Sequence, residues 1–139
     1  MKREDANNKG LKTGDVFIEK HTFSQQDFDD FARLSGDDNP IHVDPDYAAK
    51  TPFRSTVAHG MLLYSVLCSA LLKNIPGAIQ LEHQMMFPTG TTAGETVSCR
   101  FEVLEFDNAA NKVRLKIQIL RQNGELGLDG ETLISLEDV

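Results

Sequence analysis

The most informative segment of the chain is a short run of residues, Gly36 to His42, that reads Gly-Asp-Asp-Asn-Pro-Ile-His. It brings a carboxylate (Asp37), an amide (Asn39) and an imidazole (His42) close together in the sequence. A carboxylate and an imidazole that share one water molecule can exchange protons with it. We therefore expect this segment to carry out acid–base chemistry on water.

A second block, Val57-Ala58-His59-Gly60-Met61, follows shortly after and opens a long apolar run. That run predicts a helix from Gly60 to about Lys73. A backbone N–H at the start of a helix can stabilise a developing negative charge, and glycine lets a ligand approach the backbone closely. Together the two blocks suit the addition or removal of water beside a carbonyl group.

Less specific interpretations of the same residues remain open. Asp37, Asp38 and Asn39 could be simple turn formers before a proline, because such side chains bond their own backbone. His42 could be a structural histidine held by a carboxylate. His59 either lines a site or makes a structural hydrogen bond at the helix start. The four histidines show no metal-ligand spacing such as His-Glu-x-x-His, so we expect no metal.

The elements before the long helix have clear local signals. Ser24 is a good N-cap with Asp27 three positions later, and it predicts a helix that stops around Ser35-Gly36. Pro40 forbids helical continuation beyond that point. The sequence also predicts a first strand over Val16–Thr22, a short helix over Asp44–Lys50 and a loop over Thr51–Ala58.

After the long helix the apolar period changes to two. Alternating apolar and polar positions predict strands around residues 97–103 and 113–119. Another strand is expected over Ala78–Phe87, and the Asn123-Gly124 turn leads into a last strand that ends near Leu136. The long helix is apolar on almost every side, which is typical of a buried helix. We predict an α+β fold in which one antiparallel sheet wraps around this helix.

Composition sets limits on the class of protein. The 139 residues fit one domain, and the net charge of −7 makes a nucleic acid an unfavourable partner. The polar segment Met1–Gly10 reads as a flexible arm without a secretory signal, and the longest apolar run is too short to span a bilayer. Cys68 and Cys99 read as reduced, buried side chains. A cytoplasmic or organelle-matrix protein is the default expectation.

The run from Phe31 to His42, with Ala48 six positions further on, resembles the hydratase 2 motif of the MaoC-like family. Members of this family with that motif are (R)-specific 2-enoyl-CoA hydratases with the hot-dog fold. The segment Ala58-His59-Gly60-Met61 resembles the start of the family's central helix. In element order the resemblance extends from Gly14 to Leu136, whereas the close motif match lies between Phe31 and Met61.

The resemblance implies a role for each motif residue. Asp37 and His42 would hold and activate the water that adds to C3 of an enoyl thioester, and Asn39 would help to position it. We expect Asp37 to be the ionised base and His42 to orient the water or return a proton. The N–H of Gly60 would stabilise the enolate-like thioester oxygen. The product would be the (3R)-hydroxyacyl thioester.

The resemblance also implies an organisation and a set of substrate contacts. A hot-dog domain would occupy residues 11–139 after the arm of residues 1–10. No cofactor would be needed, because coenzyme A would enter only as part of the substrate. The substrate would be an acyl-CoA or an acyl-carrier thioester, and the protein would be a homodimer without membrane or nucleic-acid partners. The residues expected to contact the substrate are Ser35, Phe53, His59 and Met61. Met85-Met86-Phe87 reads as core or as a wall of the acyl pocket.

The chain departs from the family pattern in two loops. Members often have a proline two residues before the His-Gly step, where this chain has Thr56-Val57. They also often show Phe-x-x-Pro-Val-x-x-Gly-Asp, whereas the segment Phe87–Glu95 has Gly90 at the usual proline. We expect these changes to affect substrate fit and the sheet edge.

Two other functions stay open at this point. A hot-dog acyl-CoA thioesterase would place a carboxylate on or near the central helix, but Met61 to Lys73 contains no Asp or Glu. A non-catalytic acyl-thioester-binding module would keep the fold without the chemistry, which the intact Asp37, Asn39 and His42 argue against.

Overall fold

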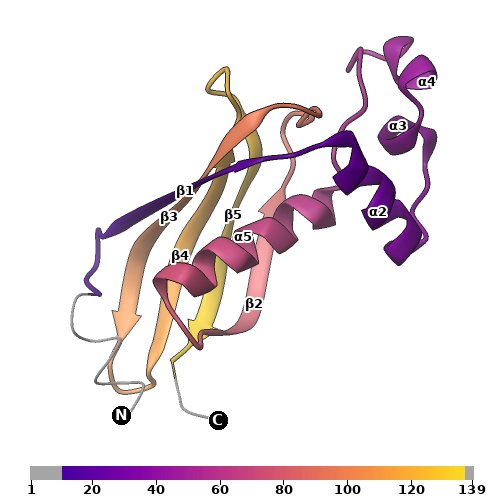
Figure 1. Cartoon of the computed structure of the whole chain (residues 1–139). Helices are drawn as coiled ribbons and strands as arrows, with labels where there is room; N and C mark the ends of the chain where they lie inside the picture. The colour runs from indigo at the N-terminus through magenta and orange to yellow at the C-terminus, as the bar shows by residue number, and fades with distance from the viewer. Residues whose placement is uncertain (1–10, 137–139) are drawn as a thin grey trace.

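The computed structural model describes residues 11–136, which form one antiparallel sheet with a long helix lying across it. Figure 1 shows α5 across one face of the sheet, with α2, α3 and α4 gathered beyond one end of it. The elements, in chain order, are β1 (Val16–Thr22), α2 (Gln25–Ser35), α3 (Pro40–Val43), α4 (Pro45–Ala49), α5 (Gly60–Asn74), β2 (Ile79–Met86), β3 (Thr96–Asp107), β4 (Lys112–Leu120) and β5 (Leu126–Ser135).

The strand order in the sheet is β1-β3-β4-β5-β2, and all neighbouring strands run antiparallel. The alternation predicted for residues 97–103 and 113–119 is confirmed, because every second residue in these parts of β3 and β4 is buried. The buried side chains include Val97, Phe101, Leu115 and Ile117. The predicted α+β class is therefore confirmed, and the sheet curls around the helix as the hot-dog fold requires.

The helix α5 is buried on one side only, which corrects the prediction that it is buried all round. Leu63, Leu67 and Leu71 face the sheet and are almost inaccessible to solvent. On the same helix the exposed fraction is 53% for Met61 and 47% for Leu72. One layer of sheet can cover only one side of a helix, so the apolar residues on the other side stay accessible in a single chain.

The helices predicted before α5 are both present as α2 and α4, and the structure adds one short helix that was not predicted. The side chain of Ser24 accepts from the N–H of Asp27, and α2 ends at Gly36, whose φ is +80°. Pro40 stops the chain from continuing α2, as expected, but it also starts a separate turn, α3, that the sequence reading missed. Proline suits this first helical position because its φ is already helical and its missing N–H would have no partner there.

The two cysteines are free, as predicted, but only one is fully buried. Burial raises the pKa of the Cys99 thiol to about 11. Cys68 is half-buried, and its thiol donates to Gln80 Oε1 at 3.2 Å, so the prediction that both are buried is wrong for Cys68.

Some predictions concern segments or properties outside this description. The predicted arm, residues 1–10, lies outside the described residues, as do residues 137–139. Among the helices of residues 11–136, none is long and apolar enough to cross a membrane. The cytoplasmic or organelle-matrix location stays a prediction.

Candidate active site

The carboxylate of Asp37 is fixed by the turn that follows α2. The N–H of Asp37 donates to Ser35 Oγ at 3.1 Å, and the Ser35 hydroxyl donates in turn to the carbonyl of Phe31 at 2.7 Å. The N–H of Asn39 reaches Asp37 Oδ1 at 3.4 Å. These local bonds hold the side chain of Asp37 in one place while leaving 55% of it exposed.

The imidazole of His42 lies opposite this carboxylate, and its orientation is set by a distant backbone group. His42 Nδ1 lies 2.7 Å from the carbonyl oxygen of Val57. Because a carbonyl oxygen can only accept, Nδ1 carries the hydrogen, and a neutral His42 has its lone pair on Nε2. That Nε2 lies 3.8 Å from Asp37 Oδ2, and 13% of the His42 side chain is exposed.

The amide of Asn39 has a structural task in addition to any role with water. Its Oδ1 accepts from the N–H of Ile41 at 3.1 Å and thereby caps α3. The turn capped in this way carries His42 near its end. Asn39 therefore sets the position of His42 through the backbone.

His59 connects the two motif blocks. Its Nε2 lies 2.8 Å from the carbonyl oxygen of Asp37, so this nitrogen donates. Its ring stacks on that of His42, with centroids 3.8 Å apart and planes inclined by 22°. The Phe31 ring approaches the His59 ring at 4.8 Å. Burial lowers the pKa of His59, and the neighbouring His42 acts in the same direction, against the opposing effects of the Asp37 carbonyl and carboxylate.

Gly60 begins α5, and in the described chain its N–H meets no acceptor. This N–H lies at the N-terminal end of α5, which is the positive end of the helix dipole. The aromatic ring of Phe87 lies directly against Gly60: a β-carbon on residue 60 would stand 2.7 Å from Phe87 Cζ. The N–H of Gly60 is thus available to hydrogen-bond a ligand that binds beside the Phe87 ring.

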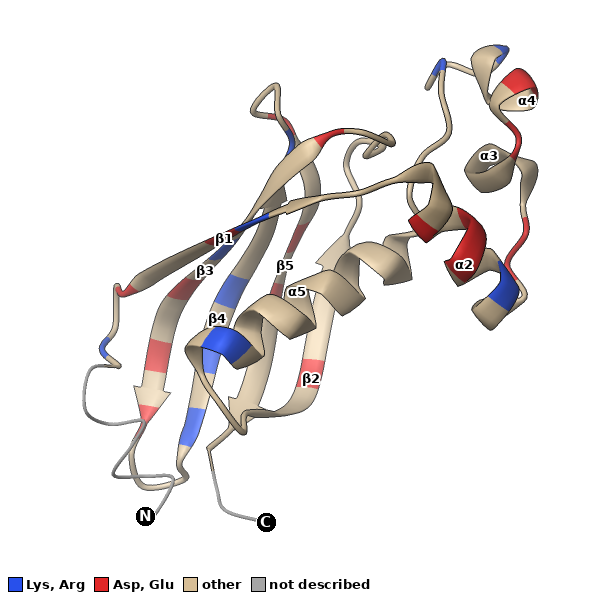
Figure 2. Cartoon of the chain, in the orientation of Figure 1, with Lys and Arg blue, Asp and Glu red and all other residues tan. Residues whose placement is uncertain are grey.

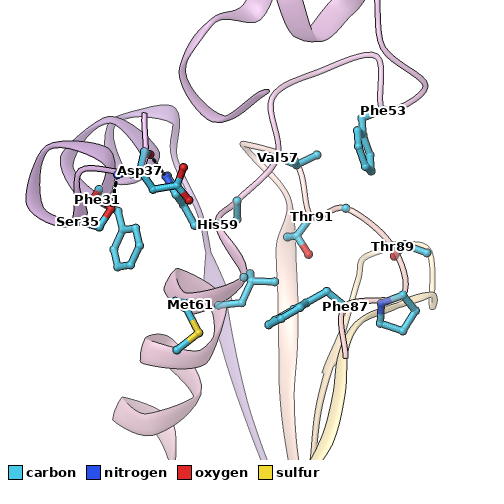
Figure 3. A pocket seen from close by; sticks show the side chains of 15 residues that line it. Phe31, Ser35, Asp37, Phe53, Val57, His59, Met61, Phe87, Thr89 and Thr91 are labelled. Carbon is cyan, nitrogen blue, oxygen red and sulfur yellow. Dashed lines mark hydrogen bonds between the residues drawn. The ribbon is translucent and has the colours of Figure 1, made fainter. Parts of the chain in front are cut away.

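Asp37, His59, Gly60 and Phe87 border one mostly apolar cavity of about 550 Å³. Figure 3 shows Asp37 and His59 on one side of it and Phe53, Val57 and Thr91 on the other. The residues predicted from the sequence that line the cavity are Ser35, Asp37, Phe53, His59, Gly60 and Met61. Asn39 and His42 do not line the cavity. His42 lies behind two residues that do, because it faces the Asp37 carboxylate and stacks on the His59 ring.

Several cavity residues come from the segment between β2 and β3. Phe87 lines the cavity, which confirms one of the two interpretations of the Met85-Met86-Phe87 run, whereas Met86 is exposed and Met85 packs against the core. Gly90 and Thr91 also line the cavity, and the sequence reading assigned them no contact. The available signal was the departure from the family pattern at Gly90.

The two departures from the family pattern meet in space. A β-carbon on Gly90 would lie 2.7 Å from Val57 Cγ1 and 2.8 Å from Phe53 Cδ1. Val57 and Phe53 therefore occupy the room that a side chain at residue 90 would need. The two changes alter the same wall of the cavity.

A metal ion is poorly matched to these groups. Asp37, His42 and His59 each offer one ligand atom, and these atoms lie within 4.8 Å of one another. However, ligands bonded to one zinc ion at ~2.1 Å stand closer together, roughly 3.4 Å apart. The two imidazoles also stack with planes inclined by only 22°, so their in-plane lone pairs lie in separate, nearly parallel planes and do not meet at one ion. The metal-free site stays a prediction.

Comparisons with known proteins show the family to which the chain belongs. The family model described as MaoC like domain matches residues 8–122. The chain is 30% identical over 132 residues to a mitochondrial 3-hydroxyacyl-[acyl-carrier-protein] dehydratase of Arabidopsis thaliana, covering 93% of this chain and 80% of that protein. It is 35% identical over 108 residues to the (R)-specific enoyl-CoA hydratase of Aeromonas caviae, covering 76% and 81%.

A solved structure gives the same answer for the fold. The unliganded R-hydratase of Pseudomonas aeruginosa superposes with a TM-score of 0.85 at 32% identity, covering 93% of this chain and 84% of that one. The resemblance read from Phe31–His42 is thereby confirmed, together with the hot-dog fold. The chain belongs to the MaoC-like domain family.

Proposed function

We propose that this protein adds water to a trans-2-enoyl-CoA to give the (3R)-3-hydroxyacyl-CoA, or removes water in the reverse direction. It is a hydro-lyase. The observation that carries this proposal is the separation of 3.8 Å between Asp37 Oδ2 and His42 Nε2, beside a cavity that also reaches the N–H of Gly60. The names of the relatives, an (R)-specific enoyl-CoA hydratase and a 3-hydroxyacyl dehydratase, support the same reaction.

The gap between Asp37 and His42 is suited to one water molecule. At 3.8 Å the two acceptor atoms are too far apart for a direct hydrogen bond. A water about 2.8 Å from both would donate one hydrogen to each. Its lone pair is then free to attack C3 of the enoyl thioester, and positioned proton transfer of this kind contributes roughly 10²–10⁴-fold.

The charge that develops during attack collects on the thioester oxygen. Gly60 lies at the start of α5, where its N–H and the helix dipole both favour an anion. A preorganised donor of this kind contributes roughly 10²–10³-fold. The Phe87 ring beside it excludes water, which strengthens the interaction.

The proton balance needs no cofactor. The water oxygen forms a bond to C3 while its proton passes to the ionised Asp37. The enolate then takes this same proton at C2, either directly from Asp37 or after the proton has passed from Asp37 to His42 Nε2, on the face from which the hydroxyl arrived. One water is consumed, no electron is transferred, and the enzyme returns to its initial protonation state. Both new bonds lie on the same face because both groups lie on one side of the cavity.

The rest of the cavity serves recognition. Ser35, Phe53, His59 and Met61 line it and are the proposed substrate contacts. Lys50 caps the end of α4, and Arg54 directly follows Phe53 on the next loop. Figure 2 shows basic residues at the end of α4 and on the loop after it. Both side chains are exposed, and we propose them as contacts for the phosphates of coenzyme A.

We place a homodimer interface along α5 and β2. In the described chain β2 pairs with β5 alone, so its other edge has no partner strand. Exposed apolar side chains gather on these two elements and the residue after β2: Met61, Leu72, Leu81, Met86 and Phe87. A second copy would cover the free edge and enclose the cavity mouth. Light scattering that gives a monomer at micromolar concentration would contradict this arrangement.

The reaction is tested by following the loss of enoyl absorbance from crotonyl-CoA. Asp37→Asn should abolish turnover and keep the fold, because the amide cannot accept the proton from water. The matched control is Asp38→Asn, which removes the same charge from the next, exposed residue and should leave the rate unchanged. Trapping the product with a stereospecific 3-hydroxyacyl-CoA dehydrogenase should identify the R isomer.

The same assay separates the alternatives. Release of free thiol from crotonyl-CoA would indicate a thioesterase, which α5 does not favour because residues 60–74 contain no Asp or Glu. Longer enoyl chains and a carrier-protein thioester extend the test. If the wild-type protein binds all of these and converts none, the protein is a binding module. Activity of Asp37→Asn within tenfold of wild type would remove Asp37 from the mechanism.

A further inference from the structure

The side chain of His59 contacts both members of the water-binding pair, Asp37 and His42. The exposed fraction of His59 is 2%, and its ring lies face to face with His42 at 3.8 Å. Its Nε2–H donates to the carbonyl oxygen of Asp37 at 2.8 Å. Figure 3 shows the His59 side chain next to Asp37, with Phe31 close by. A shift of His59 would therefore move Asp37 and His42 together.

This contact is not the ordinary task of a residue at a helix start. His59 occupies the N-cap of α5, yet its side chain makes no capping hydrogen bond to that helix. It bonds instead to a residue 22 positions earlier in the chain. The next residue, Gly60, carries the proposed thioester donor. His59 thus fixes the distance between that donor and the two groups that hold the water.

The ring is suited to this task because it stays neutral. Nε2 holds its hydrogen on the Asp37 carbonyl, and Nδ1 is buried without a partner in the described residues. A buried ring in this environment has a lowered pKa, owing first to burial. The titratable groups that face it are Asp37 and His42, and the neighbouring Phe31 is apolar. A neutral ring adds no repulsive charge when His42 takes up a proton.

We propose that His59 is a positioning residue, which aligns the Asp37 carboxylate and the His42 imidazole on one water by holding the Asp37 backbone and stacking on His42. This inference rests on the proposed hydration reaction. It assigns to His59 neither proton transfer nor direct contact with the reacting atoms.

Two variants separate the two contacts. His59→Phe keeps an aromatic face against His42 and loses the donor to Asp37. His59→Gln keeps a donor and loses the stacked ring. We expect kcat for crotonyl-CoA to fall roughly 10- to 100-fold in both, as for a displacement of about 1 Å at a reacting centre. KM should change less than threefold, because the thioester still meets the N–H of Gly60.

The pH dependence distinguishes positioning from proton transfer. In His59→Phe the pH profile of kcat/KM should keep its wild-type shape at a lower level, because His59 exchanges no proton during the reaction. Loss of one limb of the profile would instead make His59 an acid or base and overturn the proposal. The control is His21→Gln on β1, which removes an imidazole that meets the Phe23 ring edge to face at 4.6 Å, and this variant should be as active as wild type.

A spectroscopic measurement tests the geometry without relying on turnover. The ring protons of His42 should lose their ring-current shift in His59→Gln and retain it in His59→Phe. The amide signal of Asp38, which shares its peptide group with the Asp37 carbonyl, should move in the Phe variant more than in the Gln variant. Unchanged His42 and Asp38 signals in both variants, or kcat within threefold of wild type in both, would overturn the proposal. If the wild-type protein hydrates no enoyl thioester, the proposed function fails, and these signals still decide what His59 holds.

Discussion

Gly60 and Phe87 lie in contact across the start of α5, although they are far apart in the sequence. A β-carbon on Gly60 would stand 2.7 Å from Phe87 Cζ and 2.8 Å from Cε2. The glycine therefore serves a close approach of an aromatic ring to the helix start. The backbone N–H beside that contact is the proposed donor to the thioester oxygen.

Gly60→Ala should impair catalysis without unfolding the protein. The new methyl group would displace the Phe87 ring, which is exposed enough to move, and would block the thioester from the N–H. We expect kcat/KM to fall by roughly 10²–10³-fold. The free energy of unfolding should change by less than about 1 kcal/mol, because alanine suits a helix at least as well as glycine. Ser65→Ala, on an exposed position of the same helix, is the control and should retain full activity.

Gly90→Ala should affect substrate binding more than the chemical step. The added carbon would meet Val57 and Phe53, and of these only Phe53 is exposed enough to swing away. Overpacking of this kind costs about 1–3 kcal/mol of stability. KM should rise while kcat stays within a few-fold, because neither Asp37 nor His42 touches Gly90.

The contact of Gly90 with Val57 can be isolated by a double-mutant cycle. Val57→Ala makes room for the new carbon, so the double variant should be more stable than the sum of the single effects predicts, by at least about 0.5 kcal/mol. Strict additivity in urea unfolding would show that the two departures from the family pattern are independent.

Thr91→Val should stabilise the protein. The hydroxyl of Thr91 is buried and has no hydrogen-bond partner among residues 11–136. Replacing it with a methyl group of similar size removes an uncompensated desolvation cost, worth about 1 kcal/mol. Thr132→Val is the matched comparison, because its equally buried hydroxyl donates to the carbonyl of Glu82 at 3.3 Å, and it should lose stability instead. Thermal unfolding that gives both variants the same sign would contradict this difference.

Glu95 should make the stability of the fold depend on acid pH. Burial acts to raise the pKa of Glu95, but hydrogen bonds from the Thr92 N–H and hydroxyl, Arg121 and the Gln122 N–H outweigh it, so the pKa lies below its ordinary value of 4.5. The unfolded chain thus binds a proton more readily than the folded chain. The stabilisation is present above pH 4.5 and is lost as the pH falls through the lower folded value.

Glu95→Gln tests this stabilisation. At pH 7 the variant should lose about 3 kcal/mol, because Arg121 would keep its charge in a mostly buried place without the carboxylate. The difference from wild type should shrink as the pH falls from 4.5 through the lower pKa of folded Glu95, below which wild-type Glu95 is neutral. Glu125→Gln removes an exposed partner of the same arginine and should cost less than about 1 kcal/mol. Parallel pH profiles of wild type and Glu95→Gln would refute the assignment.

Much of the fold could be predicted because its signals are local. Ser24 and Asp27 fix the start of α2 through bonds three residues apart, and the strict alternation of β3 and β4 leaves one face of each strand for the core. The prediction missed α3, because Pro40 both prevents α2 from continuing and suits the first position of a new helix. Pro40 was read only as the end of a helix, whereas with the Asn39 cap it begins α3.

The burial of α5 could not be predicted from its composition. A helix that is apolar on most sides can face a sheet on one side and a second chain on the other, and the pattern is the same in both cases. The exposure of Met61 and Leu72 depends on how far one sheet reaches around the helix.

The sequence by itself determined which groups could do the chemistry, because Asp37, Asn39 and His42 lie within six consecutive residues and the chain keeps them close together. Only the tertiary structure decided how these groups are held. The ring of His42 is oriented by the carbonyl of Val57, Asp37 is bonded by His59, and the Phe87 ring lies against Gly60. Each of these contacts joins residues at least 15 positions apart. The contacts depend on how the loops pack against the start of α5, and this packing cannot be predicted from the spacing of neighbouring residues.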